Sequence, residues 1–124
     1  PGNENALSIR IYGSKGGIEW HQEAPNYLWH TPLGEPKRLI TRNGAGAGNA
    51  AARMSRIPPG HPEGYLEGFA NIYGEAAAAI RAKIAGRDPD PDVLYPTIQD
   101  GVAGVVFVDA CVRSSKCQGA WVNV

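Results

Sequence analysis

The sequence has no excess of charge of either sign. Its 124 residues carry 12 Lys and Arg against 12 Asp and Glu, and the basic residues form no block or stripe. Proteins that bind nucleic acid or an anionic membrane surface carry a basic patch, because their partners present rows of phosphate groups. We therefore predict neither nucleic acid nor a membrane as a partner.

Long hydrophobic runs are also missing. The longest apolar runs, such as residues 105–108, are far shorter than the roughly 20 residues that cross a bilayer. No signal-peptide pattern occurs at the N-terminus, so the chain is expected to be soluble and cytoplasmic. Its length suits one domain. Because the chain begins with Pro1 and not with Met, we expect that it was processed or cut from a longer polypeptide.

Cysteine is scarce, with only Cys111 and Cys117. Six positions apart in one helix and its exit, these residues point to different sides, so we expect two free thiols, buried or half-buried, and no disulfide. The cysteines and the three histidines fall at no metal-ligand spacing, and no serine lies in a G-x-S-x-G turn. The sequence therefore predicts no metal site and identifies no catalytic residue.

Alternation of apolar and polar residues predicts four β-strands in the first third of the chain. The expected strands are residues 7–12, 18–22, 27–31 and 37–41. Glycine accepts the positive φ of hairpin turns, so residues 14–17 are expected to join the first two strands. Short connections between successive strands predict an antiparallel meander.

Helical spacing follows. Between residues 62 and 85 apolar residues recur at intervals of three and four, which predicts a long helix with one buried stripe. Pro62 suits its first turn and Gly86 its end. A stiff linker rich in Pro and Asp is expected at residues 87–95.

A second long helix is predicted to begin after Thr97, with Asp100 completing an acidic variant of the capping box. It is expected to end near residues 115–116 and to be followed by a short strand at 121–124. Its predicted buried side consists of Ile98, Val102, Val105, Val106 and Val112. The fold class is therefore α+β, a mostly antiparallel sheet with two long helices packed on one face.

Residues 46–51 read GAGNAA and fit the G-x-G-x-x-A form of the dinucleotide-binding fingerprint. That fingerprint works only where a strand precedes the glycines and a long helix and a second, acid-ended strand follow them. A helix beginning at Asn49 must stop before Pro58, and the next expected element is another helix. We therefore interpret residues 43–60 as a flexible loop and assign no cofactor-binding residue.

Residues 60–65, GHPEGY, gather polar and aromatic groups where a loop enters a helix. Pockets often take their polar groups from such positions. The residues alone support two interpretations equally: either His61 and Tyr65 line a ligand pocket, or His61 caps the helix and Tyr65 packs below it.

Several stretches resemble the C-terminal domain of the Gfo/Idh/MocA oxidoreductases. Residues 7–20, LSIRIYGSKGGIEW, resemble the l-x-v-x-G-x-x-G-x-l-x-W hairpin of that family, and residues 60–73 look like its long helix. Residues 97–115 resemble its closing p-t-x-x-D-G helix ending in S-S, and residues 121–122 its last strand. The resemblance runs from about residue 6 to residue 124, with the elements in the order of the family.

This resemblance implies the latter part of a C-terminal substrate and oligomerisation domain, residues 1–124, from an NAD(P)-dependent dehydrogenase of sugars, inositols or related polyols. The cofactor glycines of the family, its E-K-P lysine and its catalytic Asp/His pair match no stretch of this chain. They are expected in an upstream part that includes a Rossmann domain. The chain alone is therefore expected to be inert and to bind neither NAD nor NADP.

By the same resemblance, His61 and Tyr65 would line the substrate pocket, with His61 offering a hydrogen bond to a hydroxyl group, and the sheet would join subunits of a homo-oligomer. The alternative is a stand-alone, non-catalytic binding or oligomerisation module, since one face of the sheet is left for a partner. Because earlier strands of the domain would be missing, the chain alone is expected to self-associate through sheet edges or exposed apolar faces.

Overall fold

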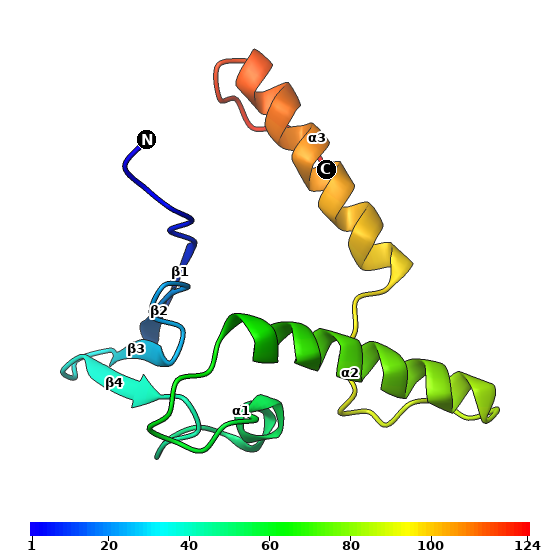
Figure 1. The fold of residues 1–124 in the computed structure, drawn as a ribbon. Helices are drawn as coiled ribbons and strands as arrows, with labels where there is room; N and C mark the ends of the chain where they lie inside the picture. The colour runs from blue at the N-terminus through cyan, green and yellow to red at the C-terminus, as the bar shows by residue number, and fades with distance from the viewer. The chain divides into compact units, whose positions relative to one another are not determined.

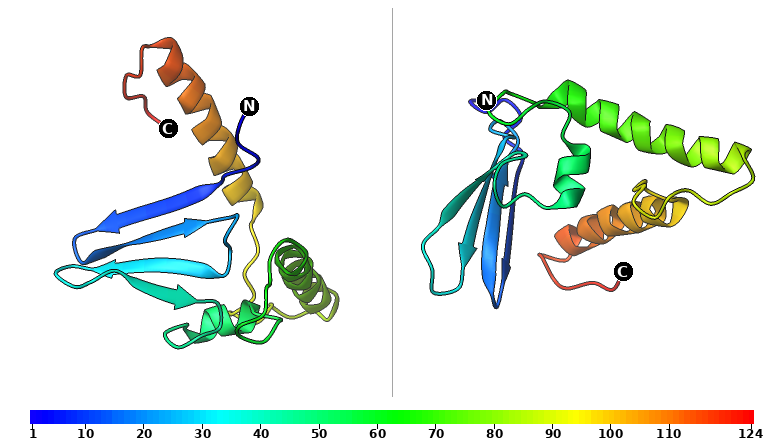
Figure 2. Two further views of the ribbon diagram at one scale, coloured as in Figure 1. Left: turned by 60° about the vertical axis from the view of Figure 1, so that its left-hand side comes forward. Right: turned by 90° about the horizontal axis from the view of Figure 1, so that it is seen from below.

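Four antiparallel strands follow one another across a single sheet. The strands are β1 (Ser8–Gly13), β2 (Gly16–His21), β3 (Tyr27–Pro32) and β4 (Arg38–Thr41). Each strand pairs with its neighbours in sequence, in the order β1-β2-β3-β4 (Figure 1). The left view of Figure 2 shows the direction alternating from strand to strand. The predicted meander is confirmed, with strand ends within two residues of those expected.

The β1–β2 turn requires glycine at position 16. Gly16 has a φ of +152°, and a Cβ placed there would lie 2.6 Å from the carbonyl oxygen of Thr31 on the neighbouring strand. Side-chain-bearing residues rarely adopt this backbone conformation. A larger residue would therefore strain the turn and push β2 away from β3.

The pleat gives the sheet two chemically different faces, since successive side chains point to opposite sides. The apolar face carries Ile9, Trp20, Leu28 and Ile40, which lie opposite one another in the register. The mixed face carries Arg10, Glu19, Trp29 and Leu39. Lys37 Nζ lies 2.8 Å from Glu19 Oε2 and 5.0 Å from the centroid of the Trp29 ring. The hydrogen bond from Lys37 lowers the pKa of the Glu19 carboxyl.

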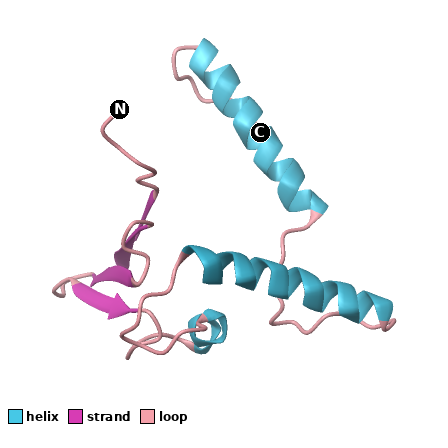
Figure 3. Ribbon diagram, in the orientation of Figure 1, coloured by secondary structure: helices cyan, strands magenta, loops and turns pink.

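All helices follow the strands in the chain (Figure 3). They are α1 (Asn49–Met54), α2 (Tyr65–Ile84) and α3 (Ile98–Lys116). This computed structural model describes residues 1–124 as two units, residues 1–74 and residues 75–124. The first unit holds the sheet, α1 and the start of α2, and the second holds the rest of α2 and α3. The α+β fold class is confirmed.

Helix α2 begins at Tyr65, three residues later than the predicted start at Pro62. Gly64 occupies the cap position, because its carbonyl accepts the first helical bond from the Gly68 N–H at 2.9 Å. Its own N–H donates to Glu67 Oε2, also at 2.9 Å. This bond lowers the pKa of the Glu67 carboxyl. Glu63, the residue before Gly64, is bonded instead to Asn26 and Arg42, which flank the strands β3 and β4, so it does not join the helix.

Helix α3 begins as predicted. The Asp100 N–H donates to Thr97 Oγ1 at 3.4 Å, and the Thr97 N–H donates to Asp100 Oδ2 at 2.7 Å. The capping box is therefore complete. The bonds that the Thr97 N–H and hydroxyl donate to Asp100 Oδ2 lower the pKa of the Asp100 carboxyl. The helix ends at Lys116, where the prediction placed its end.

The strand predicted at residues 121–124 is wrong. The structure has irregular chain there. Ser114 Oγ donates to the carbonyl of Ala120 at 2.8 Å, and Arg113 Nη2 donates to that of Asn123 at 2.9 Å. A strand needs a neighbour for its backbone groups, whereas these carbonyls bond to side chains at the end of α3.

The predicted burial of the helix faces is also wrong. Ala82 and Ala110 are the only buried apolar residues of the chain, whereas Phe69 on α2 is 44% exposed and Val105 on α3 is 72% exposed. An amphipathic face is buried only when another layer covers it. Here, the apolar stripes of α2 and α3 have no such layer within their own units.

The cysteine predictions have mixed outcomes. Cys111 and Cys117 are both free, which confirms the expected absence of a disulfide. Both thiols are exposed, so the expectation that they are buried or half-buried is wrong. In the second unit only the irregular chain of residues 119–124 lies beside α3, and it leaves both thiols exposed.

Candidate functional site

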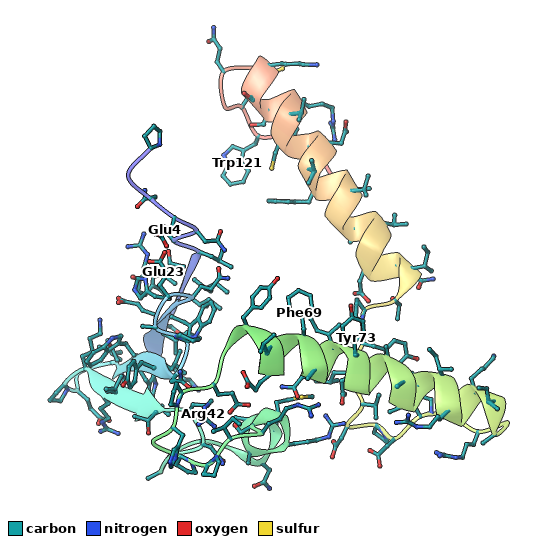
Figure 4. All side chains as sticks on the ribbon, in the orientation of Figure 1. Glu4, Glu23, Arg42, Phe69, Tyr73 and Trp121 are labelled. Carbon is teal, nitrogen blue, oxygen red and sulfur yellow. The ribbon has the colours of Figure 1, made fainter.

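The loop between α1 and α2, residues 55–64, is fastened to the sheet by one arginine. Arg42 follows the last residue of β4 and lies among the connections that lead to α2 (Figure 4). Its guanidinium donates to three backbone carbonyls of the loop, those of Ile57 at 2.7 Å, Pro58 at 3.0 Å and His61 at 2.9 Å. Because a guanidinium offers five donors in a fixed plane, one side chain can hold several turns of the loop at once.

Glu63 is the partner of this arginine. Arg42 Nη1 lies 2.5 Å from Glu63 Oε2, with only 14% and 6% of the two side chains exposed. The Glu63 carboxylate also accepts the backbone N–H of Arg56 at 2.7 Å and that of Ile57 at 3.3 Å. Glu63 is the only buried charged or polar residue of the chain. Its charge is therefore matched by a cation and by two backbone donors.

Asn26 completes this network from the turn before β3. Its side-chain amide donates to the carbonyl of Glu63 at 3.0 Å and accepts the Glu63 N–H at 3.2 Å. Arg42 Nε donates to the same amide oxygen at 2.8 Å. No buried side-chain nitrogen or oxygen lacks a partner. The three side chains thus form a closed polar network, the Asn26–Arg42–Glu63 network.

A half-polar hollow of about 270 Å³ lies beside this network. We call it the His61 hollow, and it is lined by Asn26, Tyr27, Thr41, Arg42, Gly60, His61 and Pro62. Tyr27 and Thr41 lie directly opposite each other on β3 and β4. Residues with phenol, hydroxyl and imidazole side chains therefore line one hollow, and each of these groups can donate and accept hydrogen bonds.

The structure separates the two residues singled out from the sequence. His61 lines the hollow, and its Nδ1 lies 3.3 Å from the carbonyl oxygen of Pro59. Tyr65 is not among the lining residues; its side chain is 74% exposed, and its ring centroid lies 4.8 Å from that of Phe69. Since Gly64 holds the cap position of α2 and Tyr65 is exposed, the alternative of a capping histidine above a packed tyrosine is not observed.

Sequence reasoning missed Tyr27, Thr41 and Arg42. The pairing register was the available signal, because a predicted meander places the start of the third strand beside the end of the fourth. A loop that leaves the end of the fourth strand therefore passes the start of the third strand. The residues of the loop that would face Tyr27 and Thr41 could not be read from spacing.

The glycine-rich segment of residues 43–48 borders a second hollow of about 470 Å³ in the same unit. Gly46, Ala47 and Gly48 line it together with Leu28 and Ile40 of the sheet and the first turns of α2. Helix α1 has six residues and is followed by irregular chain and another helix. The strand, long helix and second strand of a dinucleotide-binding unit are not formed, as the element order predicted.

Two further features of the whole chain bear on its class. No group of three or more His, Cys, Asp or Glu side chains lies close enough together to hold a metal ion. None of the helices combines the length and the hydropathy that crossing a bilayer requires.

The chain matches a family model over nearly its whole length. Residues 2–124 match the oxidoreductase family C-terminal alpha/beta domain, the Gfo/Idh/MocA C-terminal model. The uncharacterized oxidoreductase YfiI of Bacillus subtilis (strain 168) is 36% identical over 118 residues, which are 93% of this chain and 30% of that protein.

Solved structures agree with this match. An oxidoreductase from Sinorhizobium meliloti is 68% identical, with a TM-score of 0.90 over 99% of this chain and 33% of that chain. An inositol dehydrogenase homolog from Azotobacter vinelandii, complexed with NADH and myo-inositol, is 34% identical, with a TM-score of 0.87 over 99% of this chain and 33% of that chain. This chain thus spans about a third of the length of its relatives. It belongs to the Gfo/Idh/MocA oxidoreductase family and corresponds to the C-terminal α/β domain of that family.

Proposed function

We propose that this chain forms part of the substrate pocket and the subunit interface of an NAD(P)-dependent dehydrogenase of sugars, inositols or related polyols. The observation that carries the proposal is the match to the Azotobacter vinelandii homolog, which was solved with NADH and myo-inositol. That match covers 99% of this chain, including the loop that carries His61. We favour NAD as the cofactor, because this relative was solved in complex with NADH.

In such an enzyme, hydride passes between a carbinol carbon of the substrate and the nicotinamide, while acid and base groups move the hydroxyl proton. This chain matches neither the cofactor fingerprint in its structural context nor the E-K-P lysine motif. The proposal assigns cofactor binding and proton transfer to upstream residues of the complete polypeptide. The roles that remain for this chain are to orient the substrate and to contact a second subunit.

His61 and Tyr65 are the residues that we assign to the substrate. His61 lies at the half-polar hollow shared with Tyr27 and Thr41, where a polyol hydroxyl would find several donors and acceptors. Tyr65 follows four positions later, and its exposed ring presents a hydroxyl group beyond the hollow. Hydrogen-bonding groups that converge on a hollow are the usual source of substrate orientation.

The mixed face of the sheet is the surface that we assign to a second copy of the chain. Its apolar and aromatic residues are solvent-accessible, with Tyr12 68%, Trp29 37% and Leu39 44% exposed. Aromatic residues are enriched in protein interfaces, where large apolar groups meet a polar rim. The Lys37–Glu19 ion pair supplies charged groups on the same face. The same surface also supports the alternative function, a non-catalytic oligomerisation module.

A cofactor and substrate screen tests the proposal and separates it from the alternative. The complete polypeptide that contains this chain would be mixed with NAD or NADP and a panel of inositols, aldoses and other polyols. We expect reduced nicotinamide to form with at least one substrate, and none to form with the 124-residue chain alone. If the complete polypeptide neither turned over nor bound either cofactor in a fluorescence titration, the non-catalytic module would be the better interpretation.

A further inference from the structure

We propose that Arg42 and Glu63 are positioning residues that hold His61 at its hollow. In its consequence for catalysis, this inference rests on the substrate role proposed above for His61. Its structural content is independent of that role, because it concerns how the loop of residues 55–64 is fixed. Four observations carry it.

The first observation is where the bonds of Arg42 fall. Its Nη2 donates to the carbonyl of Pro58 and to the carbonyl of His61 itself. The His61 N–H donates to the Pro58 carbonyl at 3.3 Å, which closes the turn between them. Both backbone polar groups of His61 are therefore held. Only the side-chain torsions remain to place the imidazole.

The second observation is the unusual backbone inside this turn. Gly60 has a φ of +81°, in the region that favours glycine. In an unconstrained chain a glycine adopts many other conformations, so this turn needs contacts from outside it to keep one conformation. Arg42 bonds to the residues on both sides of Gly60 and supplies that constraint.

The third observation is that Arg42 and Glu63 form a buried ion pair, with 14% and 6% of the two side chains exposed. The desolvation of two charges offsets much of their attraction, so an apolar pair of similar volume is often as stable. An apolar pair could hold neither the three carbonyls that Arg42 binds nor the two backbone N–H groups that Glu63 binds. The Arg42–Glu63 pair therefore adds conformational definition more than it adds free energy of folding.

The fourth observation is that Arg42 joins the two walls of the hollow. It directly follows Thr41, the β4 residue that lines the hollow, and it bonds to His61 on the loop. The distance between the strand wall and the loop wall is thus set by one side chain. Lysine cannot replace it, because a single ammonium group lacks the planar fork that serves separate acceptors.

The test uses the complete polypeptide with both charges removed together. The double variant Arg42→Met/Glu63→Met leaves no unpaired buried charge, so its melting temperature should fall by less than that of either single methionine variant. Amide hydrogen exchange of residues 57–63 should accelerate by about tenfold or more, the effect expected when charge-assisted hydrogen bonds are lost. Arg42→Lys should accelerate exchange in the same segment. Arg113→Met, which removes an exposed arginine paired with Asp109 on α3, is the matched control and should leave this segment unchanged.

Kinetics with the best substrate of the screen provides the second readout. The double variant should raise KM by about the same factor as His61→Ala, and combining all three substitutions should raise it no further. Unchanged exchange of residues 57–63 in the double variant would overturn the inference. A normal His61→Ala enzyme alongside accelerated exchange would instead refute the substrate role of His61 and support the positioning of the loop by Arg42 and Glu63.

Discussion

The side-chain amide of Asn26 is hydrogen-bonded to both backbone polar groups of Glu63, which lies 37 positions later in the chain. The amide thus pairs with the backbone of Glu63 as a residue of a neighbouring strand would. It connects the turn before β3 directly to the loop before α2. The start of α2 is thereby fixed relative to the sheet inside the first unit.

Replacing Asn26 with Ala should lower the free energy of unfolding by about 2 kcal/mol, because partly buried groups of Glu63 and Arg42 lose their partners. Chemical denaturation followed by circular dichroism measures this change. Asn5→Ala is a matched control, since its amide bond to Gln22 is exposed. The control should change the free energy of unfolding by less than about 0.5 kcal/mol. Equal effects of the two substitutions would contradict the structural role of Asn26.

His61→Ala in the complete polypeptide should raise KM for the polyol by about three- to tenfold, the effect of losing one hydrogen bond to a hydroxyl group. Tyr65→Phe should have a similar or smaller effect, because it removes only the phenolic hydroxyl. Steady-state kinetics at saturating cofactor measures both changes. His21→Ala, on β2 and outside the His61 hollow, provides the control. Unchanged kinetics for both variants would remove these residues from the site.

Lowering the pH should destabilise the first turn of α2. The pKa of Glu67 lies below its ordinary value of 4.5, mainly because the Gly64 N–H donates to the carboxylate. A depressed folded pKa means that the stabilisation is present above the unfolded pKa and is lost as the pH falls through the folded pKa. The chemical shift and exchange of the Gly64 amide, followed by NMR down to about pH 3, should report this loss. Glu67→Gln should abolish this pH dependence, and titration of Glu67 at or above 4.5 would contradict it.

Thr97→Ala should destabilise the first turn of α3 by about 1 kcal/mol, because the side-chain acceptor for the Asp100 N–H is removed. Faster amide exchange at residues 100–101 and a lower helix content by circular dichroism would report the change. Thr97→Ser keeps the hydroxyl group and should restore most of the stability. If the serine variant behaved like the alanine variant, the capping bond would not be the cause.

The 124-residue chain alone should self-associate, since large apolar side chains are exposed on its sheet and helices. Light scattering at increasing concentration measures this association. If the mixed face makes the contact, Leu39→Asp should weaken association, because a charge would be buried in the interface. Leu33→Asp is the control, since this 77% exposed residue lies in the turn between β3 and β4. A monomer at all concentrations would refute the expected self-association.

The order of the secondary structure was predictable because its signals are local. Alternating residues predicted the four strands, and the Thr97–Asp100 pair predicted the start of α3, which the capping bonds confirm. The start of α2 was wrong by three residues because Pro62 is compatible with a first helical turn. What excludes it from the helix is the contact of its neighbour Glu63 with Asn26, which no local pattern reveals.

The candidate site was predictable only in part. The GHPEGY stretch pointed to His61, which the structure places at a half-polar hollow, whereas Tyr65 lies outside that hollow. Arg42 gave no signal, because an arginine after a strand is ordinary until its acceptors are known. Its acceptors on the loop include three backbone carbonyls 15 to 19 positions away, and every residue possesses such a carbonyl.

The sequence by itself therefore determined the four strands and two long helices, their order, the meander and the failure of residues 46–51 to form a dinucleotide-binding unit. These properties depend on hydrophobic period, glycine turns and proline breaks within a few residues. The tertiary structure alone decided that Arg42 and Asn26 hold the loop of His61 and that Glu63 is buried. It also decided that the helix stripes stay exposed. Such features depend on contacts between residues that are far apart in the sequence. The free energy of burying a charge or an apolar face depends on which groups those contacts place beside it.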